Sequence, residues 1–272
     1  MTDALSQRLV PDELWALVAP LVPQFTPRRQ GGGTTPVDDR AVFTAIVFVL
    51  TSGCAWRHLP PSFGVTVPTA HRRFTEWTKA GLWPRVHRAV LDELGGQGLI
   101  DWSRVVVDAA AVRAKKGGSL TGPSPVDRGK PGSKIHALSD RAGLPLSVAV
   151  SAANTNDAYG LKPLVRAIPA VKSRRGPRRR KPAKLHADKA YDIKELRAWV
   201  REQGIAVRIA RKDTESSARL GRHRWVIERT IAWLFGYRRL AMRYERKANH
   251  FCAFLTLAAA LTCFKRLAKA AT

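Results

Sequence analysis

Residues 104–108 read Arg-Val-Val-Val-Asp, a short run of β-branched residues that ends in an acid. The pattern returns at residues 184–188, where Lys-Leu-His-Ala is followed by Asp188. We therefore predict two strands whose carboxyl ends carry Asp108 and Asp188. Ligands of open α/β sheets gather at that edge, so the two acids are candidates for a functional site.

Strands and helices alternate from residue 101 onward, which predicts an α/β fold. The expected strands are 104–108, 134–139, 144–151, 184–187 and 205–210. The expected helices are 158–168, 193–203, 220–235 and 251–271. Three strands, a helix, a strand, a helix, a strand and closing helices describe a ribonuclease H-like α/β core.

Residues 10–95 are different, because they are helical in pattern and rich in tryptophan. Pro11 begins one helix, and Asp38 or Asp39 can cap a second that stops near Gly53. We therefore predict an all-α domain over residues 1–98, followed by a catalytic domain over residues 99–272.

A third helix begins near Thr66 in this part of the chain. Phe74 and Trp77 are expected to face inward, and Arg72 and Arg73 outward. A short helix, a turn and an exposed basic helix are typical of a helix-turn-helix module that binds DNA. The alternative is an ordinary three-helix bundle with a solvated charged face.

The composition favours a partner rich in phosphate. Lys and Arg number 47 against 21 Asp and Glu in 272 residues, a formal charge of +26. Such an excess is typical of nucleic-acid binding and less often of binding to anionic membranes. The longest nearly apolar run, residues 251–264, is shorter than the ~20 residues that cross a bilayer. The N-terminus lacks the pattern of a signal peptide. We expect a cytoplasmic protein with no membrane contact.

The segment 172–184 is the most basic stretch of the chain. It holds eight Lys or Arg in 13 residues and no acid. It is either a solubilising loop or a clamp for phosphates, and its position before Asp188 favours the clamp.

A third acid, Glu228, lies within the expected helix 220–235, where Trp225, Ile227 and Leu234 are expected to pack around it. Arg224 lies four residues earlier, so an Arg–Glu surface pair is the simple alternative. Taken together, three carboxylates could hold two Mg²⁺ ions, which is the chemistry that phosphodiester cleavage needs. The seven histidines and three cysteines show no metal-ligand spacing that competes with these acids.

With these motifs, the chain resembles the DDE transposases of bacterial insertion sequences, in the group named for insertion sequence five. The stretches that carry the resemblance are Val107–Ala114, Gly132–His136, Ala187–Tyr191, Arg222–Arg229, Ala232–Leu234 and Arg238–Leu240. The family implies a ribonuclease H-like core and two Mg²⁺ ions, with Mn²⁺ as a substitute. It also implies cutting and joining of double-stranded DNA at terminal inverted repeats and at a target. We expect a homodimer, because two ends must be brought together.

By match of position, Asp108, Asp188 and Glu228 would be the catalytic, metal-binding triad. Arg224 and Arg229 would be partners of a phosphate or of the triad. The residues expected to contact DNA are Arg72, Arg73, Arg113, Lys134, His136, Arg178, Arg179, Arg180, Lys189, Arg222, Arg224, Arg229, Arg238 and Arg239.

The chain departs from the usual family pattern at Ala109, Ala110, Ala190, Asn156 and Phe235. Each of these replaces a hydroxyl, glycine, histidine or lysine residue that is frequent there, and none is a triad carboxylate. Two alternatives therefore stay open: a catalytically decayed transposase that acts as a DNA-binding repressor, and a metal nuclease that cuts without rejoining.

Overall fold

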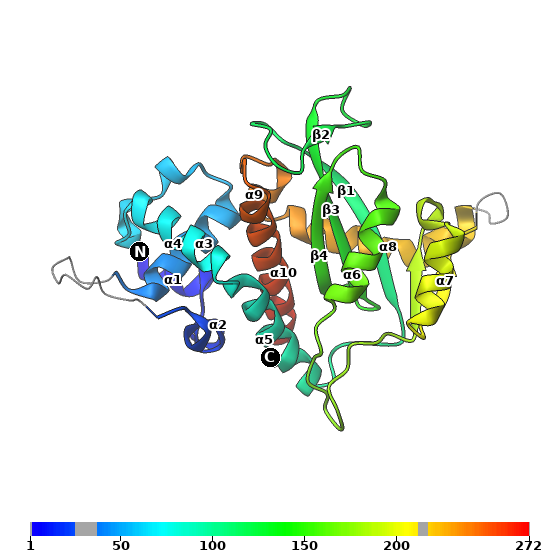
Figure 1. Cartoon of the computed structure of the whole chain (residues 1–272). Coiled ribbons are helices and arrows are strands. Elements are labelled where there is room, and N and C mark those ends of the chain that lie inside the picture. Colours follow the sequence, from blue (N-terminus) through cyan, green and yellow to red (C-terminus); the bar gives the residue numbers. More distant parts are fainter. Residues whose placement is uncertain (1, 25–36, 212–216, 272) are drawn as a thin grey trace.

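The computed structural model describes residues 2–24, 37–211 and 217–271, with side chains from 4–24, 37–211 and 225–270. Figure 1 shows a group of helices on one side, a sheet on the other, and the long helix α10 between them. Both parts share one hydrophobic cluster, which extends from Val10 to Phe264.

Among the described residues, five helices form the first part. They are α1 (Thr2–Leu9), α2 (Asp12–Val18), α3 (Asp39–Ser52), α4 (Val67–Lys79) and α5 (Leu82–Gly96), with short 3-10 turns η1 (Ala19–Leu21), η2 (Trp56–His58) and η3 (Pro61–Phe63). The expected helix starts are confirmed: Asp38 accepts hydrogen bonds from two backbone N–H groups of α3, and Thr66 caps α4. Gly53 ends α3 in the left-handed region, with φ of 72°, as the sequence predicted.

The expected outward position of Arg73 is wrong. Its side chain is buried between α4 and α3, where Nη2 donates a hydrogen bond of 2.7 Å to Asp39. A buried charge requires a partner, and α3 supplies one because Asp39 begins that helix on the face turned toward α4. Arg72 is exposed, and Phe74 and Trp77 are buried, as predicted.

In the described part of the chain, a six-stranded mixed sheet forms the second part. Its strands are β1 (Val105–Arg113), β2 (Gly122–Pro123), β3 (Pro131–Asp140), β4 (Pro145–Ala152), β5 (Lys184–Ala187) and β6 (Ala206–Ile209). The order is β2-β3-β1-β5-β6, with β4 also paired to β3. The strand β3 is antiparallel to β1 and β4, whereas β1, β5 and β6 are parallel. The five predicted strands are thus all present.

Asp108 does not end its strand, which corrects the expectation from the sequence. The strand β1 continues five residues further, because β3 supplies a ladder from Asp108 opposite Ala137 to Arg113 opposite Gly132. The shorter parallel partner β5 ends at Ala187. Asp188, by contrast, directly follows its strand as predicted.

The remaining helices cover the sheet. They are α6 (Leu161–Ala167), α7 (Lys194–Glu202), α8 (Ser217–Phe235), α9 (Arg238–Ala241) and α10 (Ala248–Ala271), with turns η4 (Asp157–Gly160) and η5 (Lys189–Tyr191). In Figure 1, α6 lies in front of the sheet and α8 behind it. The helix α10 packs against α5 and β4. By length and composition residues 248–270 could cross a membrane, but 67% of the apolar window is buried inside the molecule.

Candidate active site

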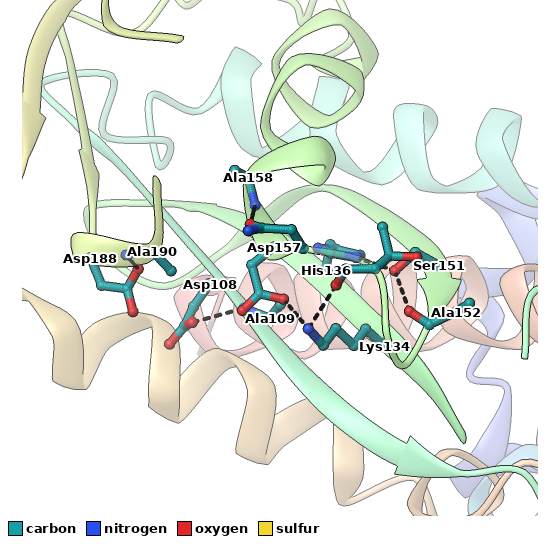
Figure 2. A network of polar contacts seen from close by, with 12 residues as sticks. Asp108, Ala109, Lys134, His136, Ser151, Ala152, Asp157, Ala158, Asp188 and Ala190 are labelled. Atoms are coloured by element: carbon teal, nitrogen blue, oxygen red, sulfur yellow. Dashed lines mark hydrogen bonds and ion pairs between the residues drawn. The ribbon is translucent and has the colours of Figure 1, made fainter. Parts of the chain in front are cut away.

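The parallel pairing of β1 and β5 brings two predicted acids together. The last paired residues are Val106 and His186, so two residues later Asp108 and Asp188 lie at the same level on neighbouring strands. Neighbouring strands are roughly 5 Å apart. Figure 2 shows the two carboxylates beside one another. Sequence positions 80 residues apart therefore meet because the strands are parallel and in register.

Local hydrogen bonds hold both carboxylates. Asp188 is the N-cap of η5, and its Oδ1 accepts a hydrogen bond of 2.9 Å from the backbone N–H of Ala190. Asp108 Oδ1 accepts one of 2.8 Å from the N–H of Ala109. Both acids are half-buried. An acid pair in this position can bind a cation while it stays within reach of a substrate.

A further acid, Asp157, lies in the same network and was missed by the sequence analysis (Figure 2). It begins η4, which follows β4, and its Oδ1 lies 2.7 Å from Nζ of Lys134. Lys134 also donates a hydrogen bond to the carbonyl of Thr155. The Asn-Thr-Asn-Asp stretch at 154–157 has the composition of a turn with a cap, and this signal could have identified the acid.

His136 is also part of this network, rather than exposed. Its side chain is buried, and Nε2 lies 2.8 Å from Oγ of Ser151. Burial lowers its pKa, which favours the neutral ring. Lys134 and His136 were predicted to contact DNA, but in the structure both side chains bond to other residues of the protein.

Tyr191, at the end of η5, is the second residue that the sequence analysis missed. Its ring is fully buried, and its hydroxyl has no hydrogen-bond partner among the described residues. Burial raises the pKa of the phenol, and the charges of Asp108, Asp157 and Asp188 raise it further. Asp108, Asp157 and Asp188 thus all lie near enough to this buried hydroxyl to disfavour its ionised form.

Glu228 lies on α8, which packs across β1 and β3. Its side chain is exposed, whereas Ile227 and Leu234 are buried as predicted. Among the described residues, no group of three or more His, Cys, Asp or Glu side chains is placed to hold a metal ion. The structure thus brings Asp108 and Asp188 together, and the role of Glu228 as the third ligand stays a prediction.

Arg229 lies between two tryptophans on α8. Its guanidinium carbon is 4.6 Å from the ring centre of Trp225 and 4.7 Å from that of Trp233, and Nη2 donates to the carbonyl of Ala142. The expectation that Trp225 packs in the core is wrong, since 52% of it is exposed. Residues 225, 229 and 233 form one stripe at helical spacing, and the cation holds both rings at the surface.

Arg239 is also used inside the protein. It is buried, it lies 2.7 Å from Glu245, and Nη1 donates to the carbonyl of Cys54. Its expected contact with DNA phosphate would require these bonds to break. The neighbouring Arg238 is exposed.

The other predicted DNA contacts lie nearer the surface. Arg178 bonds to Asp92 at 2.8 Å, Arg180 to the carbonyl of Arg166, and Arg179 lies over the ring of Trp102. Arg72 pairs with Glu76 and Arg113 with Asp127. Lys189 is half-buried. The side chains of Arg222 and Arg224 lie outside the described residues.

Two family models match the chain. Residues 101–263 match the family described as "Transposase DDE domain", and this match covers more than half of the chain. The chain belongs to the DDE transposases. Residues 10–87 match "Putative transposase of IS4/5 family", which agrees with the resemblance seen in the sequence.

Curated relatives place this DDE transposase near one insertion element. The "Putative transposase for insertion sequence element IS402" of Burkholderia cepacia is 44% identical over 150 residues, which cover 55% of this chain and 71% of that protein. The "Insertion element IS402 uncharacterized 16.2 kDa protein" of the same species is 40% identical over 123 residues, 44% of this chain and 84% of that protein.

Solved structures give a looser likeness. A piggyBac transposase synaptic complex with hairpin DNA has a TM-score of 0.47 at 8% identity, over 98% of this chain and 76% of that chain. A pre-cleavage Mos1 transpososome has a TM-score of 0.29 at 10% identity, over 89% of this chain and 82% of that chain.

A DDE transposase depends on divalent metal ions, and part of this site fits such an ion. Asp108 and Asp188 offer hard carboxylate oxygens side by side, the donor type that Mg²⁺ and Mn²⁺ accept. The buried hydroxyl of Tyr191, which lacks a hydrogen-bond partner among the described residues, lies near the same acids. The oxygen-only donor set excludes a thiolate-type zinc site here.

Proposed function

We propose that this transposase binds the terminal inverted repeats of an insertion sequence, hydrolyses a phosphodiester at each end and joins the freed end to target DNA. The observation that carries the proposal is the acid pair Asp108 and Asp188, set by parallel strands in a protein of charge +26. The cationic surface attracts the DNA backbone, and the acids provide the negative charge that holds cations against it.

Asp108 and Asp188 would hold the metal, with Glu228 as the third ligand from α8. Two Mg²⁺ ions in such a site would activate the attacking oxygen and stabilise the leaving oxygen. Lys134 balances the negative charge of Asp157 through their 2.7 Å contact. Asp157 therefore adds no uncompensated negative charge beside the two metal-binding acids. The N–H groups of Ala109 and Ala190 orient the two carboxylates.

The remaining parts of the proposal concern the scaffold. We propose a ribonuclease H-like core, which is supported by the order of three antiparallel strands followed by two parallel ones. The helical part that precedes it would bind the element ends, and exposed arginines such as Arg178 and Arg72 would hold phosphates. A homodimer that works at cytoplasmic DNA would bring the two ends together.

The test is an assay of cleavage and strand transfer with Mg²⁺ and DNA from the borders of the element. We expect Asp188→Asn, Asp108→Asn and Glu228→Gln each to lower the rate by at least about 1,000-fold, as loss of a metal ligand does. Glu202→Gln is the control, because that acid is exposed at the end of α7 and its loss should leave the rate within about twofold.

Full activity of Asp188→Asn would contradict the site. The alternatives give other results with the same DNA. A decayed transposase that acts as a repressor would bind the ends and cut nothing, and a plain nuclease would cut without joined products.

A further inference from the structure

A cleft lies where the helical part meets the C-terminal part of the chain. It has a volume of about 690 Å³, within the range of ligand sites. Its walls come from the turn after α3, the face of α4, the loop after β1 and the segment from α9 into α10. The proposed chemistry at Asp108 and Asp188 uses none of these residues.

The cleft is strongly cationic. Five of its lining residues are Lys or Arg, and one is an acid, Glu245. That acid is already bound to the buried Arg239 at 2.7 Å. The exposed cations of the cleft are Arg57, Lys116, Arg246 and Lys247. Within the described part of the chain no acid pairs with these four, so their charge is available to an anion.

Aromatic rings form the inner wall. The ring of Trp56 lies 5.4 Å from that of His71 and 5.6 Å from that of Phe74. Phe74 and His250, whose ring centres are 5.3 Å apart, are buried behind them. Tyr244 also lines the cleft and is 36% exposed. The accessible rings of Trp56, His71 and Tyr244 can accept a base by stacking, whereas a free phosphate or a carboxylate would gain nothing from them.

The cleft is held open by fixed contacts. Arg239 on its floor bonds both to Glu245 and to the carbonyl of Cys54, which joins segments 185 residues apart in the chain. Its guanidinium also lies 5.4 Å from the ring centre of Tyr244. A preformed site loses little entropy when a ligand enters.

We propose that this cleft binds an unpaired DNA segment, with its phosphates on Arg57, Lys116, Arg246 and Lys247 and a base against the aromatic wall. Cationic grooves with interleaved aromatic side chains are typical of single-strand binding, because every base offers a face for stacking. A duplex keeps its bases stacked on one another, so it could use the cations but not the rings.

The position of the cleft suits a DNA strand that is cut at Asp108 and Asp188. Lys116 follows the end of β1, the strand that carries Asp108. From Asp108 to Arg113 the strand spans roughly 17 Å, at about 3.3 Å per residue. This inference rests on the proposed action on DNA, although binding in the cleft requires no metal ion.

The experiment measures fluorescence anisotropy of a labelled 15-nucleotide single strand with the full chain in EDTA, so that no cleavage occurs. The double variant Arg246→Gln/Lys247→Gln should weaken binding about tenfold. The control Arg201→Gln/Arg208→Gln removes the same charge from exposed residues outside the cleft and should change binding less than threefold. Equal losses in both variants would overturn the proposal, since they would show binding by net charge alone.

Two further arms test the aromatic wall. Tyr244→Ala should weaken binding about tenfold, whereas Tyr244→Phe keeps the ring and should bind like the wild type. An oligonucleotide of the same length with abasic sites should bind more weakly than the intact strand. If the abasic strand binds equally well, or if the matching duplex loses as much affinity in the cleft variants, the cleft binds backbone phosphates and the proposal is wrong. Loss of cleavage in Asp188→Asn has no effect on this assay, so the two proposals fail separately.

Discussion

At the scale of single residues, charge and burial decide the character of the site. Asp108 and Asp188 are half-buried, and each is oriented by a backbone N–H group. Asp157 is matched by Lys134, and Tyr191 lies buried in the field of all three acids. The buried hydroxyl of Tyr191 is unsatisfied, because no described residue accepts or donates a hydrogen bond to it.

Tyr191→Phe should therefore raise the free energy of unfolding by about 1 kcal/mol, since a buried hydroxyl without a partner costs about 1–3 kcal/mol. Urea denaturation measures the change. Tyr159→Phe is the control, because Tyr159 is 75% exposed and its hydroxyl is solvated, so the change should stay within about 0.5 kcal/mol. A loss of stability in Tyr191→Phe would show that the hydroxyl bonds to a carboxylate or a bound water.

At the scale of elements, the ends of helices and strands position the site. The strand β1 is long because it pairs along its length with the long antiparallel strand β3. The strand β5 ends earlier, at Ala187, so Asp188 lies outside the sheet and caps η5. The helix α5 ends with two glycines whose surroundings differ. A Cβ at Gly95 would lie 2.1 Å from the carbonyl oxygen of Lys172, whereas a Cβ at Gly96 would meet nothing within 4 Å.

Gly95→Ala should lower the free energy of unfolding by about 2 kcal/mol, since the backbone of Lys172 must move to admit a methyl group. Gly96→Ala is the matched control in the same helix and should raise it by up to about 1 kcal/mol, because alanine has the higher helix propensity. Thermal and urea denaturation measure both. Similar effects of the two substitutions would contradict the close approach of α5 to the basic segment.

At the scale of the whole molecule, α10 and α5 join the helical part to the sheet. His87 of α5 lies at this junction: its Nε2–H donates a hydrogen bond of 2.8 Å to the carbonyl of Pro145, which begins β4. Sγ of Cys263 on α10 lies 4.0 Å away. Three elements thus meet at one buried imidazole. Burial lowers its pKa to about 4, although the bond to Pro145 opposes the shift.

This pKa predicts a loss of stability in acid. In the unfolded chain His87 becomes protonated as the pH falls below about 6.5. In the folded chain it stays neutral until the pH reaches about 4. Folding is therefore penalised increasingly as the pH falls through this window, by up to about 3 kcal/mol from this group. Above pH 6.5 the contribution is constant.

The measurement is urea denaturation at pH 7 and pH 4.5 for the wild type and His87→Gln. The variant should lose less stability between the two pH values than the wild type, since it has no proton to take up. The control His58→Gln, at an exposed histidine, should keep most of the wild-type dependence. An unchanged dependence in His87→Gln would show that His87 is protonated in the fold.

Local patterns in the sequence determined most elements of this protein and its family. Caps at Asp38 and Thr66, the end of α3 at Gly53 and the alternation of strands are properties of neighbouring residues, so they could be predicted. The motifs around Asp108 and Asp188 identified the two acids that the sheet brings together. The family follows from the same motifs.

Only the tertiary structure decided which charged and polar groups are used internally. Arg73 is paired with Asp39, Arg239 with Glu245 and Asp157 with Lys134. In each pair the partner lies in another element, or, for Arg239 and Glu245, in the segment that follows the same helix. The cost of burying a charge depends on that partner, and residue type or spacing along the chain does not reveal it.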